Sequence, residues 1–250
     1  MAKYILLDTE TTGAGEKDRI IQLGYLVLEG SSTEVYNEFC SSDVPISYKA
    51  MEVHGITPEM IEGKPTCTDL PAYNKLLELN SPENYLIIHN APFDIGMLEK
   101  EGFENKMQLI DTLRVAKHLL PDEEGHRLQY FRYRMGLYKR EEEEARKLGI
   151  EVKAHDAIGD VLVLKLLLSE LRKLVMQKFP TEESVAKMVE LTKTPIYIEK
   201  FRFGKYKDKT LKEVALQDPG YLQWMLNKME NLDDDLRYSI EKTLQEVTTS

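Results

Sequence analysis

The chain has 250 residues, of which 33 are Lys or Arg and 43 are Asp or Glu, so its formal net charge is −10. Hydrophobic residues make up 42% and charged residues 30%, which excludes a disordered or low-complexity chain. A chain of this length buries roughly 70–75% of its unfolded surface, enough for one large core or two smaller ones. The acidic balance argues against a protein that coats nucleic acid, since such proteins are normally basic.

The first 120 residues predict a mixed sheet with helices around it. Runs of β-prone residues at 3–7, 20–28 and 33–39 predict strands, and their short connections favour an antiparallel meander. A further strand, apolar throughout and therefore buried, is expected at 85–89. Helices are expected near 50–54, from Pro58, and over 70–79, 94–100 and 112–119, the last capped by Asp111.

The rest of the chain predicts helices and a second, smaller unit. Residues 121–154 are rich in charge, which predicts short helices and an exposed acidic stretch at 141–144. A long helix over 157–176 is apolar nearly all round in its first half. The break at Phe179-Pro180 divides the chain into domains 1–178 and 180–250. The second domain is expected to hold a short helix to about 191, a hairpin over 196–212, and helices near 211–217, 220–229 and 235–247.

Cysteine content and hydropathy predict a cytoplasmic protein without a membrane partner. Cys40 and Cys67 are too few for a disulfide framework and lack neighbouring ligands for zinc, so free thiols in a reducing compartment are expected. The first apolar stretch is cut at Asp8, too early for a secretory signal. The longest later apolar run, 161–168, is interrupted by Lys165 and is too short to span a membrane.

Acidic residues follow two of the predicted strands and open the long helix. Asp8 ends the first strand, and strand alternation places Glu10 on the same face. Asp94 follows the later buried strand, and Asp160 lies in the first turns of the long helix, five residues after His155. Singly, each could cap a turn or a helix or lie at the surface. Together, four convergent carboxylates would suit Mg²⁺ or Mn²⁺, two of which could promote a phosphoryl displacement while a His takes the proton from water.

The segments that carry these residues resemble a known family. ILLDTETTG at 5–13, HNAPFD at 89–94 and HDAIGD at 155–160 resemble the three exonuclease motifs of the DEDDh (DnaQ-like) 3′→5′ exonucleases, a group that includes the proofreading epsilon subunit of bacterial DNA polymerase III. HGIT at 54–57 and LIDTLRVAK at 109–117 also resemble stretches common in these domains.

The resemblance implies a metal-dependent 3′→5′ exonuclease that hydrolyses phosphodiester bonds at DNA 3′ ends, in single strands or at frayed or duplex ends, and releases nucleoside 5′-monophosphates. DNA is then the expected partner, in repair or replication. Two divalent ions, Mg²⁺ or Mn²⁺, are the implied cofactors. The implied catalytic residues are the metal ligands Asp8, Glu10, Asp94 and Asp160 and the general base His155. Two alternatives stay open: an RNA-trimming exoribonuclease of the same family, and an epsilon-like subunit whose C-terminal module docks a DNA polymerase or repair complex.

The resemblance extends beyond the nuclease motifs. Residues 202–224 resemble the C-terminal module of exodeoxyribonuclease X-like proteins, so nearly the whole chain is covered, and 121–154 depart from the family pattern. The expected fold class is therefore α/β: an RNase H-like mixed sheet flanked by helices, with a small α+β C-terminal module.

Six residues are candidates for binding the substrate. The turn after Glu10 contains Gly13, which lets the backbone approach a terminal nucleotide, although an ordinary tight turn is the alternative. Phe93 could stack on a base or fill the core. The candidate substrate-binding residues are Thr11, Thr12, Gly13, His54, Asn90 and Phe93.

Two segments carry an excess of positive charge in this acidic chain. Residues 196–212 hold six basic and two acidic residues, a net +4, and residues 114–140 hold seven and three, also a net +4. Aromatic residues interleave with the second segment. Basic and aromatic residues together suit the binding of a single strand, although a charged run is more often a solvated face.

Overall fold

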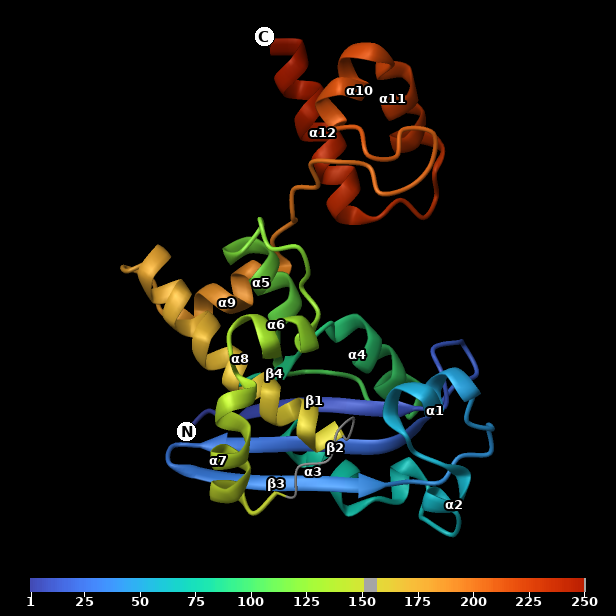
Figure 1. Cartoon of the computed structure of the whole chain (residues 1–250), viewed down its shortest axis with the longest axis vertical. Coiled ribbons are helices and arrows are strands. Elements are labelled where there is room, and N and C mark those ends of the chain that lie inside the picture. Colours follow the sequence, from blue (N-terminus) through green and yellow to red (C-terminus); the bar gives the residue numbers. More distant parts are fainter. Residues whose placement is uncertain (151–156, 250) are drawn as a thin grey trace. The chain divides into compact units, whose positions relative to one another are not determined.

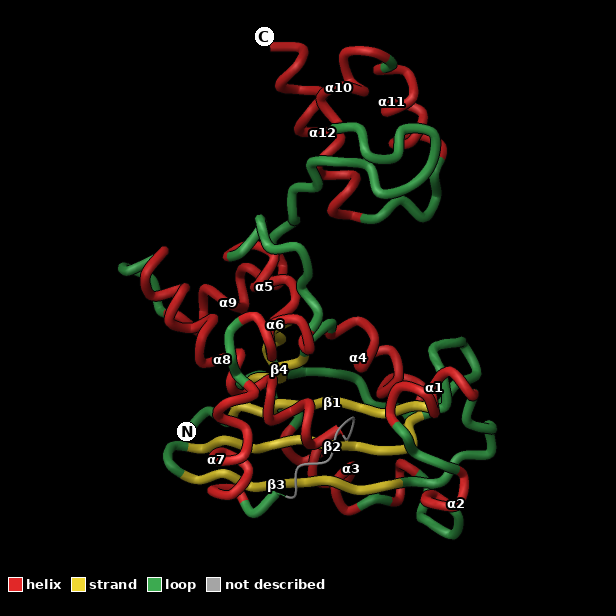
Figure 2. Tube along the Cα trace, in the orientation of Figure 1, coloured by secondary structure: helices red, strands yellow, loops and turns green. Residues whose placement is uncertain are grey.

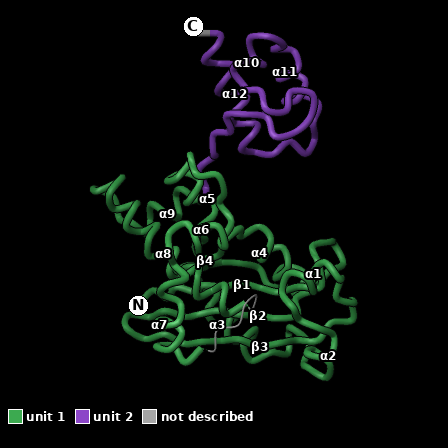
Figure 3. The backbone as a smooth tube through the Cα atoms, viewed as in Figure 1, with its two compact units in different colours: residues 1–192 green, residues 193–250 purple. Residues whose placement is uncertain are grey.

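The computed structural model describes residues 1–150 and 157–249 (Figure 1). The chain divides into two compact units, residues 1–192 and 193–250 (Figure 3). We predicted a boundary between residues 178 and 180, and the units divide later because helix α9 buries Val185 and Met188 in the core of the first unit. Among the described residues, no helix is both long and apolar enough to cross a membrane.

The first unit is built on a five-stranded sheet in the order β3-β2-β1-β4-β5. The first three strands pair antiparallel as the predicted meander and lie side by side in Figure 2, and β4 and β5 continue parallel to β1. The sheet is therefore mixed, as expected. The strands are β1 (Tyr4–Thr11), β2 (Ile20–Glu29), β3 (Ser32–Phe39), β4 (Tyr85–Ile88) and β5 (Gln108–Asp111).

Helices connect the strands and cover the sheet (Figure 1). They begin where the sequence predicted them to within a few residues, with one consequence for the site: α4 begins at Ala91, so Asp94 lies inside its first turn and is not its cap. The helices of the first unit are α1 (Tyr48–His54), α2 (Pro58–Ile61), the 3₁₀ helix η1 (Cys67–Asp69), α3 (Pro71–Leu79), α4 (Ala91–Lys100), α5 (Thr112–Leu119), α6 (Leu128–Arg134), α7 (Tyr138–Leu148), α8 (Ala157–Lys178) and α9 (Ser184–Lys193).

Two apolar clusters lie on the two faces of the sheet, because alternate strand residues point to opposite sides. On one face, Leu6 and Leu26 belong to a cluster with residues of α5, α6, α8 and α9. On the other face, Ile5 and Leu7 belong to a cluster with residues of α3 and α4. The first half of α8 is buried nearly all round, as its sequence predicted, and this holds its first turns against the sheet.

The second unit has its own core, formed around α10 (Leu211–Gln217), α11 (Pro219–Lys228) and α12 (Asp234–Thr249). The predicted hairpin over 196–212 forms only at its base, where Leu211 donates to the Glu199 carbonyl and Phe201 to the Lys209 carbonyl beside the isolated antiparallel bridge between Lys200 and Thr210, and its two strands do not form. Strand alternation fails because the buried residues Phe201 and Tyr206 are five positions apart. The backbone also turns at Gly204 and Asp208, which have φ of 74° and 70°. The segment is a folded loop that packs on the helices.

Candidate active site

Asp8 and Glu10 lie on β1 and share one face of the sheet. In the antiparallel register, Asp8 is opposite Gly24 and Glu10 is opposite Gln22. Directly opposed residues point to the same side, and so do residues two apart along a strand. This is the face of Leu6, which packs in the cluster that contains α8. Both carboxylates therefore point toward the side of the sheet that α8 covers.

The start of α8 rests on this part of the sheet. A Cβ atom on Gly24 would lie 2.8 Å from Ala157 Cβ and 2.9 Å from the Ile158 nitrogen, so the helix approaches as closely as a glycine allows. The Ala157 N–H donates to Gln22 Oε1 over 3.3 Å. Gly24 and Gln22 are the cross-strand partners of the two acids, and Asp160 is in the first turn of α8. The first turn of α8, which carries Asp160, is thus close to the part of β1 that carries Asp8 and Glu10.

Asp94 approaches β1 from α4 and is only 3% exposed. Its Oδ1 accepts hydrogen bonds from the backbone nitrogen of Thr9 over 3.0 Å and from Thr9 Oγ1 over 2.8 Å. Burial and, to a smaller extent, the nearby charge of Asp111 raise the pKa of Asp94, the hydrogen bonds from Thr9 lower it, and the net result is a pKa of about 7. Asp94 thus contacts Thr9, the residue between Asp8 and Glu10. Because a buried charged carboxylate needs a partner of opposite charge, this position favours the binding of a cation.

The chemistry of these side chains fits a divalent metal, because all four offer carboxylate oxygens, the ligands that Mg²⁺ and Mn²⁺ prefer. In the described part of the chain, no three His, Cys, Asp or Glu side chains are grouped closely enough to hold a metal ion. Asp94 is turned to Thr9, and Asp160 accepts a hydrogen bond from Gln129. The convergence of the four acids stays a prediction, and the predicted base His155 lies outside the described residues.

A chain of side chains leads from α7 through α6 to Asp160. Gln129 Nε2 donates to Asp160 Oδ1 over 2.7 Å, and Arg132 Nη1 donates to Gln129 Oε1 over 3.3 Å. Arg132 in turn forms two hydrogen bonds with Glu141, of 2.7 and 2.6 Å. Glu141 is only 4% exposed, so the prediction of an exposed acidic stretch over 141–144 is wrong at its first residue.

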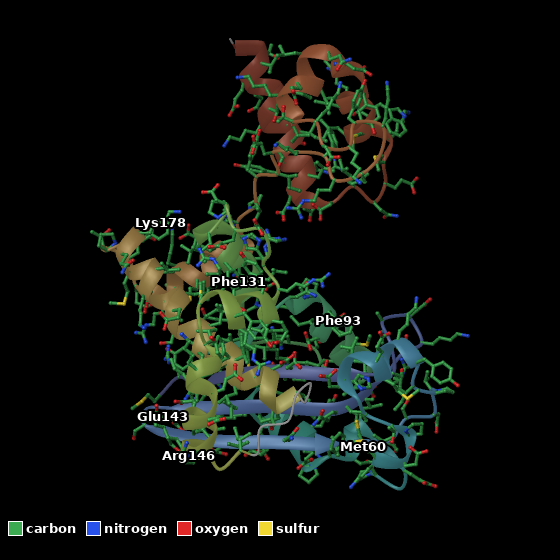
Figure 4. All side chains as sticks on the ribbon, viewed as in Figure 1. Met60, Phe93, Phe131, Glu143, Arg146 and Lys178 are labelled. Atoms are coloured by element: carbon green, nitrogen blue, oxygen red, sulfur yellow. The ribbon has the colours of Figure 1, made fainter. Side chains whose placement is uncertain are left out.

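This network was not predicted, although one sequence signal was available. Glu141 shares a helix face with Ala145, which is also buried, whereas Glu143 between them is exposed (Figure 4). A charged residue on the apolar face of an amphipathic helix needs a partner. The partner, Arg132, lies on another helix, and no local pattern identifies it.

The predicted substrate-binding turn is tightly built. Thr12 is fully buried and its Oγ1 donates to Asp18 Oδ1 over 2.7 Å, while Thr11 Oγ1 donates to the Gly13 carbonyl over 2.8 Å. A Cβ atom on Gly13 would lie 2.7 Å from an Asp18 carboxylate oxygen. The two threonine side chains are therefore engaged within the turn, and glycine is required for the close approach of Asp18.

His54 braces the end of β1 from the buried end of α1. Its Nε2 lies 3.1 Å from the Thr11 carbonyl, and its Nδ1 accepts from the Ile56 N–H over 2.9 Å. Burial lowers the pKa of His54, which favours the neutral ring with its proton on Nε2. Both ring nitrogens are thus used to position the strand end, and a direct substrate contact by His54 stays a prediction.

Asn90 and Phe93 precede Asp94 in the second motif. Asn90 is exposed in the left-handed region with φ 74°, and its N–H donates to Asp111 Oδ1 over 3.0 Å. Asp111 also accepts from the Ala91 and Leu113 N–H groups, which confirms it as the cap of α5 and fixes the start of α4. Phe93 is half-buried on α4 and packs on the core (Figure 4), so it contributes to the core while keeping part of its ring exposed.

Three arginines of the basic segment 114–140 pair with acids of the first unit. Besides the pair of Arg132 with Glu141, the side chain of Arg134 pairs with Glu123 over 3.0 Å. Farther along the segment, Arg140 pairs with Glu170 over 2.7 Å. These arginines build the helical layer around the site, and little of their charge remains open for a nucleic acid.

Comparisons with known proteins agree with this arrangement. The model of the Exonuclease family matches residues 5–168, and that of the Exodeoxyribonuclease X-like C-terminal family matches residues 201–230. The chain is 28% identical over 246 residues to Exodeoxyribonuclease 10 of Escherichia coli (strain K12), covering 96% of this chain and 98% of that protein. It is 32% identical over 136 residues to DNA polymerase III subunit epsilon of Haemophilus influenzae, covering 48% of this chain and 52% of that protein.

Solved structures show the same fold. Exonuclease X in complex with 5′ overhanging duplex DNA matches with a TM-score of 0.53 and 24% identity, covering 77% of this chain and 99% of that chain. Escherichia coli exonuclease I in complex with a dT13 oligonucleotide matches with a TM-score of 0.54 and 18% identity, covering 72% and 43%. At these identities the likeness concerns the fold, and it confirms the predicted RNase H-like mixed sheet flanked by helices.

Proposed function

The chain belongs to the Exonuclease family, and on that premise we propose that it removes nucleotides one at a time from the 3′ ends of DNA with the help of two divalent metal ions. One observation carries the proposal. The start of α8 is packed onto Gly24, which lies opposite Asp8, so the helix that carries Asp160 begins against the part of the sheet that carries Asp8. We propose that this close approach serves to bring Asp160 to Asp8 and Glu10.

In the proposed reaction, Asp8, Glu10, Asp94 and Asp160 hold the metals. Bound there, two divalent ions supply charge that stabilises the attacking and leaving oxygens. His155 takes a proton from the attacking water, whose oxygen bonds to phosphorus as the bond from phosphorus to the 3′ oxygen breaks. The leaving 3′ oxygen takes up a proton from solvent, so the shortened chain ends in a 3′ hydroxyl, and the released nucleoside carries a 5′ phosphate.

The substrate's end is proposed to meet the turn after β1. Thr12 and the close approach of Asp18 to Gly13 hold that turn rigid, and His54 anchors the carbonyl of Thr11. A rigid turn can present backbone N–H groups to a terminal nucleotide without an entropic cost at binding. Phe93, with part of its ring exposed, is proposed to contact a base, and Asn90 to contact the same end of the strand.

DNA is preferred over RNA as the proposed substrate because Exodeoxyribonuclease 10 aligns over nearly the whole of both chains. The epsilon subunit aligns with only about half of each chain, so a subunit role in a DNA polymerase is less favoured. RNA trimming and polymerase docking stay as alternatives. Rates on DNA and RNA strands of identical sequence decide between the two substrates.

The proposal is tested with an oligonucleotide labelled at its 5′ end. Removal from the 3′ end gives a ladder of shortened labelled strands that requires Mg²⁺ or Mn²⁺ and stops with EDTA. Asp8→Ala and Asp160→Ala should each lose most of the activity. Asp122→Ala, which removes an exposed acid, is the matched control and should cleave as the wild type does. Immediate release of the label as a mononucleotide, or cleavage unaffected by EDTA, would contradict the proposal.

A further inference from the structure

The second unit carries a cluster of aromatic rings that continues from its core to its surface. Phe201 and Tyr206 are buried, and the Tyr221 ring lies against both, with its centroid 6.2 Å from that of Phe201 and 5.0 Å from that of Tyr206. Trp224 stacks on Tyr221 at 5.9 Å and 27°. Phe203 packs edge-on to Phe201 at 6.4 Å. Phe203 and Trp224 are each 51% exposed, so two large rings face solvent on a rigid aromatic base.

The loop 200–212, which carries three of these five rings, is also the positively charged part of the unit. It holds six basic residues and one acid, although residues 193–250 together hold ten basic and ten acidic residues. Lys205 Nζ lies 4.7 Å from the Tyr206 ring centroid and 5.9 Å from that of Tyr221, and it pairs with Asp218 over 3.2 Å. Cation and ring surfaces are therefore interleaved.

Several other basic side chains of this loop are available to a ligand. Arg202, Lys207 and Lys212 are exposed, and none of them forms an ion pair within the part of the chain that the structure describes. The arginines of the segment 114–140 differ in this respect, because three of them pair with acids of the first unit. In the described part of the chain, one of the six basic residues of the loop forms an ion pair, against at least three of the seven in the segment 114–140, so a larger share of the loop's charge is available to an anion.

The backbone of the loop brings the rings and the cations together. Gly204, with φ 74°, turns the chain between Phe203 and Lys205, and a Cβ atom there would lie 3.5 Å from Tyr221 Oη. Lys205 is thereby directed to Tyr221, and Phe203 to Phe201, whose ring lies against Tyr221. Trp224 reaches the same region from α11 through its stacking on Tyr221.

We propose that this surface, formed by Arg202, Phe203, Lys205, Tyr221 and Trp224, binds single-stranded nucleic acid. Unpaired bases expose π faces that can stack on Phe203 and Trp224, and the loop cations are complementary to the phosphates between them. A duplex hides those base faces, so the aromatic part of the surface would be unused by it. The proposal rests on the proposed function only in that the ligand is a nucleic acid strand, and its test needs no cleavage.

Trp224 makes the test direct because it is the single tryptophan of the chain. The full chain is titrated with an oligonucleotide of about 12 nucleotides, within the range of site sizes that one binding fold covers. EDTA is present so that the strand stays intact. Stacking of a base on Trp224 should quench its emission saturably, and oligo(dT) and oligo(U) as separate arms show whether DNA or RNA is bound.

Two variants and one matched control locate the binding. Phe203→Ala should raise the Kd by about 5- to 100-fold, the range for loss of one stacked base. Lys205→Glu should weaken binding and lower the slope of log K against log salt by about 0.7 or more. The control is Lys242→Glu, because Lys242 also lies over two rings, those of Tyr197 and Tyr238, away from the loop cations. It should leave the Kd within about twofold.

The outcomes separate this proposal from the proposed function. If quenching persists in Asp8→Ala, which is expected to lose cleavage, the surface binds independently of the active site, as we propose. Absent cleavage in the wild type together with normal quenching would count against the proposed function alone. The surface proposal is overturned if a labelled strand binds without any change in Trp224 emission, or if Lys242→Glu weakens binding as much as Lys205→Glu. It is also overturned if no strand binds, which would leave the exposed rings to a protein partner.

Discussion

Replacing Gln129 by leucine should slow cleavage without unfolding the protein, because Gln129 holds Asp160 in place. Gln129 lies on α6, is half-buried, and donates one hydrogen bond to Asp160 over 2.7 Å. Leucine has a similar volume and cannot donate. The change therefore removes one hydrogen bond that orients the Asp160 carboxylate, while the packing around α6 is kept.

The magnitude follows from that single contact. A hydrogen bond to a charged group contributes about 1.5–3 kcal/mol, which corresponds to about a 10- to 150-fold change in a rate or a binding constant. Loss of a group that orients a metal ligand typically costs about 10- to 100-fold in metal affinity or activity, which agrees. Glu141→Gln acts one step farther away, through Arg132, and should give a smaller loss in the same direction.

The assay is the initial cleavage rate as a function of Mg²⁺ concentration. A positioning role predicts that Gln129→Leu needs more Mg²⁺ for half-maximal rate, and that part of the lost rate returns at high Mg²⁺. Combining Gln129→Leu with Glu141→Gln should cost less than the sum of the two single changes, since both act through one chain of contacts. Glu143→Gln is the matched control, because Glu143 is an exposed neighbour of Glu141 on α7. Wild-type rate and wild-type Mg²⁺ dependence in Gln129→Leu would refute the reasoning.

Three further predictions concern the sheet, a buried histidine and the metal. Gly24→Ala should lower the free energy of unfolding by about 1–3 kcal/mol in urea titrations, because the new Cβ meets Ala157. Gly96→Ala is the control and should not lower it, because its Cβ meets open space. Equal effects of the two changes would count against the close approach of α8. Burial lowers the pKa of His89, so the unfolded chain binds more protons below about pH 6.5, and stability present above that pH is lost as the pH falls. His89→Gln should flatten that loss between about pH 7 and pH 5, and an unchanged slope would contradict the assignment. Mg²⁺ should raise the Tm of the wild type and not that of Asp8→Ala, since a bound ion stabilises only the state that binds it. An equal rise in both proteins would argue against Asp8 as a residue that coordinates the metal.

The parts of the fold that follow from local periodicity could be predicted from the sequence. The apolar run before Asp8 and the long apolar α8 were placed correctly at their starts, although β1 continues past Asp8 to Thr11. The cap at Asp111 was also predicted, because a carboxylate before a helix satisfies free N–H groups within its own segment.

Other features depend on contacts between distant residues, which no local pattern contains. Glu141 was expected to be exposed because it opens a run of four glutamates, and its burial follows from Arg132 on a different helix. The predicted hairpin 196–212 failed because Phe201 and Tyr206 turn inward to pack against α11 residues such as Tyr221. Helix α9 joins the first unit through core contacts that the sequence break at Pro180 does not indicate.

The net charge of −10 does not show which charges are available to a nucleic acid, because that depends on which of them form ion pairs. Three arginines of 114–140 pair with acids of the first unit, whereas within the described residues only Lys205 of the loop 200–212 forms an ion pair. An acidic chain can therefore present a local surface suited to a nucleic acid strand. What matters is which charges have partners, and that is decided by tertiary structure.

The identity of the first product released from a defined strand tests the central claim most directly. The substrate is a run of dT nucleotides with a single dA at the 3′ end, incubated briefly with the full chain and Mg²⁺ and then measured by mass spectrometry. The account predicts that deoxyadenosine 5′-monophosphate appears first and alone, and that Asp160→Ala releases almost none. Release of a thymidine nucleotide first, or of a product carrying a 3′ phosphate, would contradict it.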